Sequence, residues 1–439
     1  MVEVLNLEPA HLNVAPGEGA DHCKKLMHEL PRHKLLRLVF FLMQAPIGIL
    51  LPSFVLYLRF DRQFSESQIS LITALGGLTI VLFQQAWGYF ADVVFRKKQL
   101  ILANLAISGL LFWSIAFVPS YWAIVCVVFA FNVFSTPLVQ LLHGLLFSHR
   151  GSERWFGPLR AYGSLGFVVT NLAVAYVADR LTDGNLRFIF PLYAALCAAT
   201  FVCVMPVPEA KVVRASDRPS FWAVQWYFLR RPPVAIFLGF VFLYQCAHSL
   251  SYTLQSILMK NMGADHTLIA SSYSLAAVLE VPVFFAAHRL LKKFGAERLL
   301  AFAAVVQSIR WILVWKATSP TEIVAISALH AITFGLFYAA AVSYINSHAP
   351  YKFKASAQTL FAFVYFGWAG IVSNLVGGQV TRGGIFEQPL TNFLRRVLPF
   401  SGQDPLANLY LFSAGVAAVA ALLAFVLCFT RGQMPDQPE

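Results

Sequence analysis

The sequence predicts an all-α membrane protein with twelve transmembrane helices in two six-helix halves and both termini in the cytoplasm. Three observations predict this class. The chain is 58% hydrophobic and only 12% charged, with a mean hydropathy of +0.65. Apolar runs recur along the chain, each long enough to cross a bilayer, which takes about 20 residues. Lysine and arginine gather in alternate loops between these runs.

The apolar runs divide the chain into spans and links. We expect spans at residues 35–58, 68–91, 99–118, 122–147, 156–178, 187–205, 233–257, 267–291, 298–316, 321–347, 354–380 and 406–430. Because hydrocarbon offers no partner to backbone N–H and C=O groups, segments of this length cross as helices. The spans form an N-terminal half at 35–205 and a C-terminal half at 233–430.

The basic loops orient the chain. Basic residues follow the second, fourth, sixth, eighth and tenth spans, as Arg96 to Lys98, Arg150 and Arg154, Arg230 and Arg231, Lys292 and Lys293, and Lys352 and Lys354 show. Loops rich in lysine and arginine stay in the cytoplasm, which places both termini there. The net charge of +12 therefore reflects membrane orientation, and we expect no nucleic-acid partner.

The polar segments outside the spans have separate predicted locations. Residues 1–34 form a cytosolic tail without a secretory signal, 206–232 a cytosolic central linker, 381–405 an extracytoplasmic insert and 431–439 a second cytosolic tail. Within the linker, the aromatic-rich residues 221–228 fit either a helix at the cytosolic interface or an aromatic belt at the start of the next span.

Three ionisable side chains lie inside consecutive C-terminal spans. Glu280, Arg310 and His330 occupy the eighth, ninth and tenth spans, one in each. An ionised group near the centre of a bilayer costs on the order of 3 kcal/mol or more. Their presence therefore predicts a substrate or proton pathway.

The loop after the second span carries a motif, in which Gly88 is followed by Asp92, Arg96 and Lys97. Gly88 permits close helix contact, and Asp92 and Arg96 are one turn apart and can pair. The motif resembles the signature loop of the major facilitator superfamily, which implies the corresponding two-half fold and a conformational latch at the cytosolic mouth. The alternative is an ordinary basic cytosolic loop with an incidental aspartate.

A second motif, FGPLRAYGSLGF at 156–167, opens the fifth span. It resembles the phenylpropionate permease and nucleoside–proton symporter branch, which is related to lactose permease. The similarity continues with Glu280, Arg310 and His330 in the second half. It implies that Arg160 binds substrate and that the other three form the charge network of these transporters.

Two departures alter the implied chemistry. Gln140 stands where the family has a carboxylate in the fourth span, with His143 one turn further on. Thr333 stands where the family has the carboxylate that carries the coupled proton. The proton mechanism of the sugar permeases therefore does not transfer whole.

The residues themselves leave two interpretations of the charged trio open. Burial favours the protonated form of Glu280 and a nearby Arg310 favours the ionised form, so small rearrangements can load and release a proton. His330 titrates near neutrality and can relay it. Alternatively, Glu280 and Arg310 form a fixed structural ion pair. Gln245 and His248 in the seventh span either face a cavity or bond neighbouring helices.

The chain has no phosphate loop, metal-ligand motif or nucleophile elbow, so we expect no cofactor, metal or enzymatic activity. The resemblance implies a secondary active transporter in a bacterial inner membrane, and we expect a monomer. Its expected partners are lipid, a proton and a small polar or aromatic solute, which by the same resemblance is a nucleoside, oligosaccharide or aromatic acid. An uncoupled facilitator and a non-transporting receptor or scaffold are the alternatives.

Overall fold

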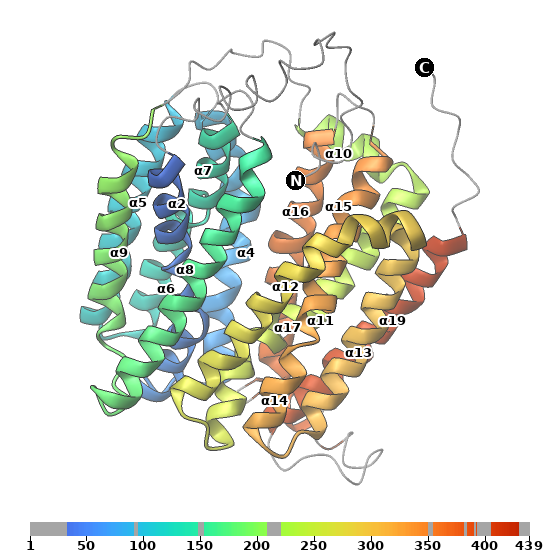
Figure 1. The fold of residues 1–439 in the computed structure, drawn as a ribbon. Coiled ribbons are helices and arrows are strands. Elements are labelled where there is room, and N and C mark those ends of the chain that lie inside the picture. Colours follow the sequence, from blue (N-terminus) through green and yellow to red (C-terminus); the bar gives the residue numbers. More distant parts are fainter. Residues whose placement is uncertain are drawn as a thin grey trace. The chain divides into compact units, whose positions relative to one another are not determined.

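A computed structural model describes residues 33–91, 95–147, 153–208, 221–349, 354–381, 384–389, 392 and 405–429. Every regular element in these ranges is a helix (Figure 1). The helices of the N-terminal half are α2 (His33–Gln44), α3 (Ile47–Ile49), η2 (Leu50–Phe54), η3 (Tyr57–Asp61), α4 (Glu66–Tyr89), α5 (Lys97–Ser114), η5 (Ile115–Phe117), α6 (Tyr121–Ser135), α7 (Leu138–Phe147), α8 (Glu153–Arg180) and α9 (Ile189–Val204).

The C-terminal helices follow a short linker helix, α10 (Phe221–Leu229). They are α11 (Pro232–Asn261), α12 (His266–Phe294), α13 (Ala296–Lys316), α14 (Pro320–Ser327), η6 (Ala331–Leu336), α15 (Phe337–Ser347), α16 (Lys354–Ala362), η8 (Phe363–Trp368), α17 (Ala369–Val380) and α19 (Pro405–Phe429).

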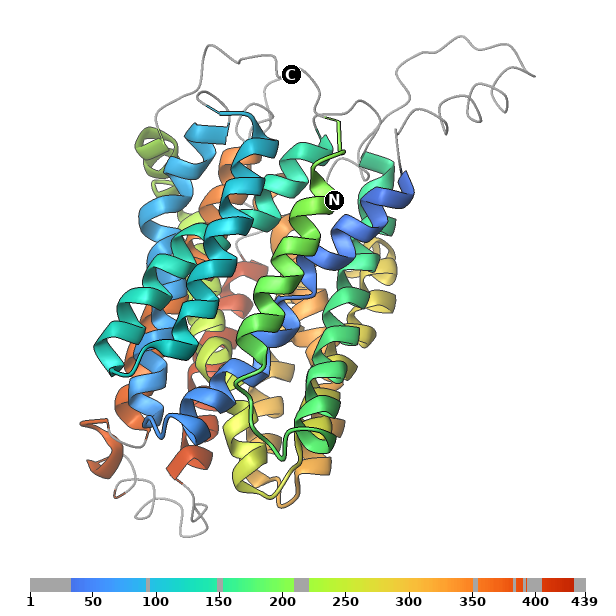
Figure 2. The same ribbon diagram turned by 90° about the vertical axis from the view of Figure 1, so that its left-hand side faces the viewer.

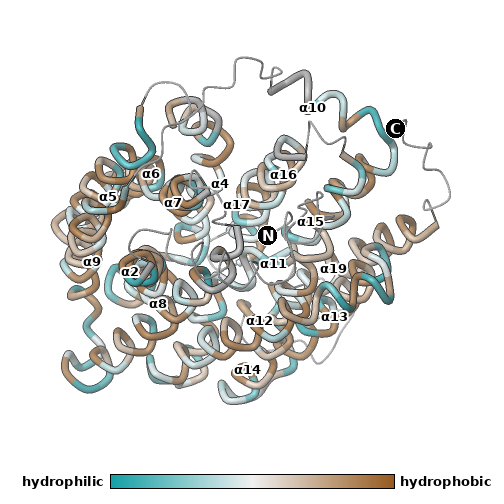
Figure 3. Tube along the Cα trace, turned by 45° about the horizontal axis from the view of Figure 1, so that its top comes forward, coloured by the Kyte–Doolittle hydropathy of each residue, from teal (hydrophilic) through white to brown (hydrophobic). Residues whose placement is uncertain are grey.

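Eleven helical segments among the described residues are long and apolar enough to cross a membrane. They coincide with eleven of the expected spans. The remaining span, expected at 187–205, is the shorter apolar helix α9, which has 16 residues. Figure 3 shows long apolar stretches along α5, α6 and α19, and polar residues toward the helix ends.

The chain packs into two compact units. Unit 1 comprises Met1–Ile49, Phe83–Thr170 and Phe188–Ser216, and unit 2 comprises Leu50–Leu82, Asn171–Arg187 and Asp217–Glu439. The boundaries do not follow the two halves of the sequence. The expected spans 35–58, 68–91 and 156–178 each have one end in each unit.

Unit 1 is held by aromatic and small-residue contacts. The ring of Phe112 on α5 lies 4.4 Å from that of Tyr193 on α9 and 5.2 Å from that of Phe131 on α6. A Cβ atom at Gly109 would lie 3.1 Å from Cβ of Cys197, so α5 and α9 pack closely. Figure 2 shows the N-terminal helix α2, in blue, beside α9, which it contacts.

Unit 2 has an apolar core in which α11 and α13 both pack against α19 (Figure 1). In this core the rings of Tyr244 and Phe337 stack, with centroids 3.8 Å apart and planes within 6°. Two helices of this unit, α12 and α13, meet at Gly295, where the chain turns from one into the other with φ of +82°. A glycine adopts this angle without a steric penalty.

The tenth span is interrupted, whereas the sequence predicts one helix over 321–347. Its first part, α14, ends at Ser327, and the wide π-helical turn η6 precedes α15. A π-helical turn disturbs the regular backbone hydrogen bonding, and such turns are frequent at functional sites. The hydroxyl of Tyr244 donates to the carbonyl oxygen of Thr333 at 2.5 Å, which satisfies the backbone inside this turn.

Candidate functional site

The three ionisable side chains expected within the bilayer meet in unit 2. His330 lies between the other two: its Nε2 is 3.2 Å from Oε1 of Glu280, and its Nδ1 is 2.9 Å from Nη1 of Arg310. The same Nη1 donates to Oγ1 of Thr333 at 3.0 Å. Arg310 and Thr333 are fully buried, whereas the Glu280 side chain is 17% exposed. Among Glu280, Arg310 and Thr333, Glu280 therefore has the most exposed side chain.

The hydrogen bond from Arg310 determines where the histidine carries its proton. A guanidinium has only donors, so Nδ1 of His330 must accept. In a neutral imidazole the proton then resides on Nε2, which donates it to Oε1 of Glu280. A doubly protonated ring would lose the Arg310 bond. The arrangement therefore disfavours a second proton on His330 and leaves Glu280 as the group that can accept one.

The position of His330 between Glu280 and Arg310 argues against a direct ion pair between those two residues. The imidazole separates the carboxylate from the guanidinium and joins them through its two nitrogens. Protonation of the Glu280 carboxylate would therefore alter the hydrogen bond that the His330 ring accepts from the Arg310 guanidinium. The cluster is thus a linear chain of hydrogen bonds from Glu280 to Thr333.

An aromatic frame surrounds His330. The rings of Tyr252 on α11 and Phe334 on η6 lie nearly parallel to the imidazole, within 3°, at 4.7 and 5.3 Å. The Arg310 guanidinium carbon lies 4.5 Å from the centre of the Trp311 ring and 5.6 Å from that of Tyr252. Cation–π contacts of this kind offset part of the cost of burying a guanidinium.

Arg310 retains unused hydrogen-bonding capacity. Its Nε and Nη2 atoms are buried and have no hydrogen-bond partner among the described residues. An unpaired buried donor costs about 1 to 3 kcal/mol, and more when it is charged. The cluster can therefore accept a further hydrogen-bond acceptor, such as a water molecule or an oxygen of a solute, if one has access.

The two candidates in the seventh span have similar positions on α11. His248 is 5% exposed, and its ring stacks on His330 at 5.2 Å and lies 5.8 Å from Trp311. Gln245 is 8% exposed, and its Oε1 has no hydrogen-bond partner among the described residues. The structure thus brings His248 into the cluster and leaves Gln245 buried one turn away on the same helix.

The three candidates of the N-terminal half lie in unit 1. His143 on α7 is flanked by the rings of Phe40, at 6.0 Å, and Phe156, at 4.9 Å, and interacts electrostatically with Arg160 on α8. Arg160 is half-buried and Gln140 is exposed. The structure therefore places His143 within electrostatic range of Arg160.

The glycines of the motif at 156–167 explain how Arg160 is positioned. A Cβ atom at Gly166 would overlap the carbonyl oxygen of Phe41, and one at Gly163 would lie 2.8 Å from Cγ of Gln44. At Gly166 only glycine permits this approach of α8 to the first span, because a Cβ atom would collide with the backbone of Phe41. The helix that carries Arg160 is thereby set against α2.

The expected conformational latch is described in part. Asp92 lies outside the described residues. Arg96 precedes α5 in an extended conformation, and the Lys97 side chain on α5 passes 3.2 Å from the position of a Cβ atom at Gly144. A Cβ atom at Gly88 would meet no atom within 4 Å. No close helix contact at Gly88 is thus found among the described residues, and the conformational latch stays a prediction.

Sequence reasoning missed Phe334, and the buried position of Trp311, as parts of the site. Tyr252 and Phe334 each stand four residues after a histidine of the cluster, and this spacing places them one helical turn away. Trp311 adjoins Arg310 and is fully buried, although a tryptophan in a membrane helix more often lies at the interface. The four-residue spacing from His248 and His330 was the sequence feature that could have indicated these aromatic residues.

Comparisons with known proteins agree with the fold. The model of the MFS_1 like family matches residues 33–387. The maltose permease of Geobacillus stearothermophilus is 27% identical over 351 residues, which cover 80% of this chain and 88% of the permease. The probable 3-phenylpropionic acid transporter of Escherichia coli (strain K12) is 25% identical over 260 residues, which cover 56% of this chain and 65% of that protein.

A solved structure gives the same result for the architecture. The crystal structure of a mutant of the nucleoside transporter NupG superposes with a TM-score of 0.77 at 17% identity, over 90% of this chain and 98% of that chain. The resemblance to major facilitator transporters is therefore confirmed. Because the family model matches most of its length, this integral, multi-pass membrane protein belongs to the MFS_1-like family of the major facilitator superfamily.

Proposed function

We propose that the protein is a secondary active transporter that couples the movement of a small polar or aromatic solute to that of a proton. In this proposal the twelve helices span a bacterial inner membrane, with both termini in the cytoplasm and two pseudo-symmetric halves that alternate access to a central site. Membership of a transporter family and the bacterial origin of the maltose and phenylpropionic acid relatives support it.

The observation that carries the proposal is the hydrogen-bonded chain from Glu280 through His330 to Arg310. Intramembrane ionisable groups mark ion and substrate pathways. Glu280 is a carboxylate at the partly exposed end of the chain, and Arg310 is a fixed positive charge at the buried end. A proton that binds the carboxylate removes its charge and weakens the bond that His330 donates to it.

The coupling step follows from this geometry. A proton enters from one side and binds a carboxylate oxygen of Glu280, and the neutral acid accompanies the solute through the change of access. The proton leaves when Glu280 faces the other side, and the carboxylate again accepts the hydrogen bond of His330. Thr333 serves as the acceptor for Arg310, so the positive charge stays in place throughout.

We assign solute binding to Arg160, His143 and Gln140 from the N-terminal half and to Gln245 and His248 from the C-terminal half. Arg160 and the free donors of Arg310 favour hydroxyl-rich or anionic groups. Rings such as those of His143 and Tyr252 favour an aromatic or sugar ring. Nucleosides, oligosaccharides and aromatic acids meet these requirements, in keeping with the substrates after which the similar proteins are named.

The runner-up is a facilitator that moves solute without a proton. Thr333, in the place of the expected proton-carrying carboxylate, is the observation in its favour. A scaffold that transports nothing is the third possibility.

One experiment separates the three. A thermal-shift screen of purified protein against sugars, nucleosides and aromatic acids identifies a solute, because a ligand of the folded state raises its stability. Proteoliposomes with an internal pH indicator then report proton flux on addition of that solute. We expect solute-dependent acidification. Solute flux that ignores an imposed pH gradient would support the facilitator, and the absence of both fluxes would support the scaffold.

A further inference from the structure

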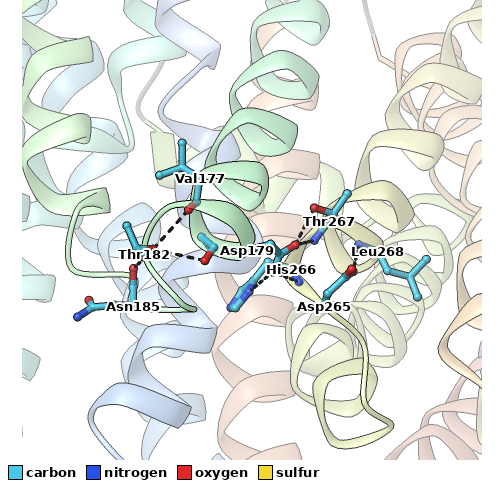
Figure 4. Close-up of polar contacts among 9 residues, drawn as sticks. Val177, Asp179, Thr182, Asn185, Asp265, His266, Thr267 and Leu268 are labelled. Carbon is cyan, nitrogen blue, oxygen red and sulfur yellow. Dashed lines mark hydrogen bonds and ion pairs between the residues drawn. The ribbon is translucent and has the colours of Figure 1, made fainter.

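A second polar cluster lies in unit 2, far along α12 from Glu280. At the end of α8, the carboxylate of Asp179 accepts hydrogen bonds from the first residues of α12 (Figure 4). Its Oδ1 is 3.0 Å from the backbone nitrogen and 2.8 Å from Nδ1 of His266. Its Oδ2 is 2.7 Å from both the backbone nitrogen and Oγ1 of Thr267. We call Asp179, His266 and Thr267 the Asp179 clasp.

The Asp179 clasp supplies hydrogen-bond acceptors to the N-terminus of α12. The first backbone N–H groups have no partner within the helix, and they carry a partial positive charge. Asp265 caps the next residue, Leu268, at 2.7 Å. The N–H groups of His266 and Thr267 are instead taken up by Asp179, a residue from another helix. The end of α8 thus completes the cap of α12, with both charge and hydrogen bonds in its favour.

The turn that follows α8, directly after Asp179, is held in shape by hydrogen bonds. Thr182 donates to the carbonyl oxygen of Asn185 at 2.8 Å (Figure 4). The backbone nitrogen of Gly184 donates to the carbonyl oxygen of Ala178 at 2.8 Å. Gly184 has φ of +83°, which a glycine adopts readily. Asp179 therefore lies in the last turn of α8, next to a well-formed turn that ends the helix.

The Asp179 clasp lies at one end of a longer row of contacts between α8 and α12, which we call the α8–α12 seam. Asn171, two turns before Asp179 on α8, is fully buried and donates to the carbonyl oxygen of Ala270 at 2.9 Å and to Oγ of Ser274 at 3.1 Å. In the same unit, Thr73 on α4 donates to Oδ1 of Asn374 on α17 at 2.6 Å. Ends of N-terminal-half spans are thus fastened to C-terminal-half helices.

From these contacts we infer that the Asp179 clasp is a gate that holds the extracytoplasmic side closed in this conformation and that opens during the transport cycle. The inference rests on the proposed function and orientation, which put the α8–α9 and α11–α12 connections outside. Release of the clasp frees the N-terminus of α12, the helix that also carries Glu280. The gate and the proton site thereby share one rigid element.

The test measures access to the seam and needs no solute. In the full chain with its six cysteines replaced, Ser274→Cys places a thiol at a position that is 6% exposed in this structure. Membrane-impermeant maleimide is added to the extracytoplasmic or the cytoplasmic side of oriented vesicles. Asp179→Asn removes the charge, and we expect it to raise the labelling rate from the extracytoplasmic side at least tenfold.

The matched control is Asp183→Asn, the same change four residues further along the loop. Asp183 is exposed and has φ of +49°, an angle that asparagine tolerates. We expect its labelling rate to equal that of the parent. Thr267→Val, which removes one donor to the carboxylate, should raise the rate in the same direction but less, and it provides the test if Asp179→Asn does not fold.

An unchanged labelling rate in folded Asp179→Asn or Thr267→Val protein would overturn the gate, as would an increase confined to the cytoplasmic side. Size-exclusion profiles and melting temperatures establish that each variant is folded. A labelling response in a protein that moves no solute or proton would leave the gate standing and overturn the proposed function instead. The two failures are therefore distinguishable.

Discussion

His330 and Arg310 are joined by a hydrogen bond of 2.9 Å between Nδ1 and Nη1, in which the imidazole can only accept. This relationship assigns different tasks to the two titratable groups of the cluster. The histidine holds its single proton toward Glu280, and we propose that the carboxylate is the group that gains and loses one. Proton coupling at Glu280 depends on this division of roles.

The hydroxyl of Thr333 should stabilise the buried guanidinium. Thr333→Val keeps the shape but removes the acceptor that lies 3.0 Å from Nη1 of Arg310. We expect a loss of about 1 to 3 kcal/mol in the free energy of unfolding, because a buried charged donor is left unpaired. Thr333→Ser keeps the acceptor and serves as the control in thermal melts of the purified protein. Equal melting temperatures for the valine and serine variants would contradict the bond.

The ring of Tyr252 should contribute more to stability and transport than its hydroxyl does. The ring lies parallel to that of His330 at 4.7 Å and beneath the Arg310 guanidinium at 5.6 Å. Tyr252→Phe preserves both contacts and should transport at close to the parent rate. Tyr252→Leu removes them and should reduce stability by about 1 to 2 kcal/mol and slow transport. Similar behaviour of the two variants in melting and uptake assays would show that the stacking is incidental.

Gly166 should not tolerate a side chain. A Cβ atom there would overlap the carbonyl oxygen of Phe41, so Gly166→Ala forces α8 away from the first span. We expect a cost of about 1 to 3 kcal/mol and a lower yield of folded protein. Gly239→Ala is the matched control, because a Cβ atom at Gly239 meets nothing within 4 Å and alanine favours a helix. The prediction fails if the two alanine variants melt alike.

Much of the fold could be predicted because a membrane span is a long, local signal. The expected spans at 68–91 and 298–316 differ from α4 and α13 by only a few residues at each end. The interruption of the tenth span could not be predicted in this way. It depends on Tyr244, a residue of another helix, whose hydroxyl bonds the carbonyl oxygen of Thr333. Local hydropathy carries no information about such a partner.

The residues of the site could be predicted from the sequence, but the order in which they contact one another could not. The cost of burying charge singles out Glu280, Arg310 and His330 from the sequence. Their one-per-helix distribution is compatible with a direct pair between acid and base, and only packing places the imidazole between them. Asp179 escaped notice for a related reason. In the sequence it belongs to a loop of mixed charge, and its role appears only when the N-terminus of α12 lies against it.

The most direct test of the central claim is proton-driven accumulation by Glu280→Gln protein in proteoliposomes, with an inward proton gradient and the solute found by thermal shift. Glutamine keeps an oxygen near Nε2 of His330 but cannot carry a proton, so we expect uphill uptake to vanish while exchange of preloaded solute continues. Glu322→Gln, the same change at an exposed residue that bonds Thr318, should accumulate solute like the parent. Uphill uptake by the Glu280→Gln protein would contradict the assignment of the proton to Glu280.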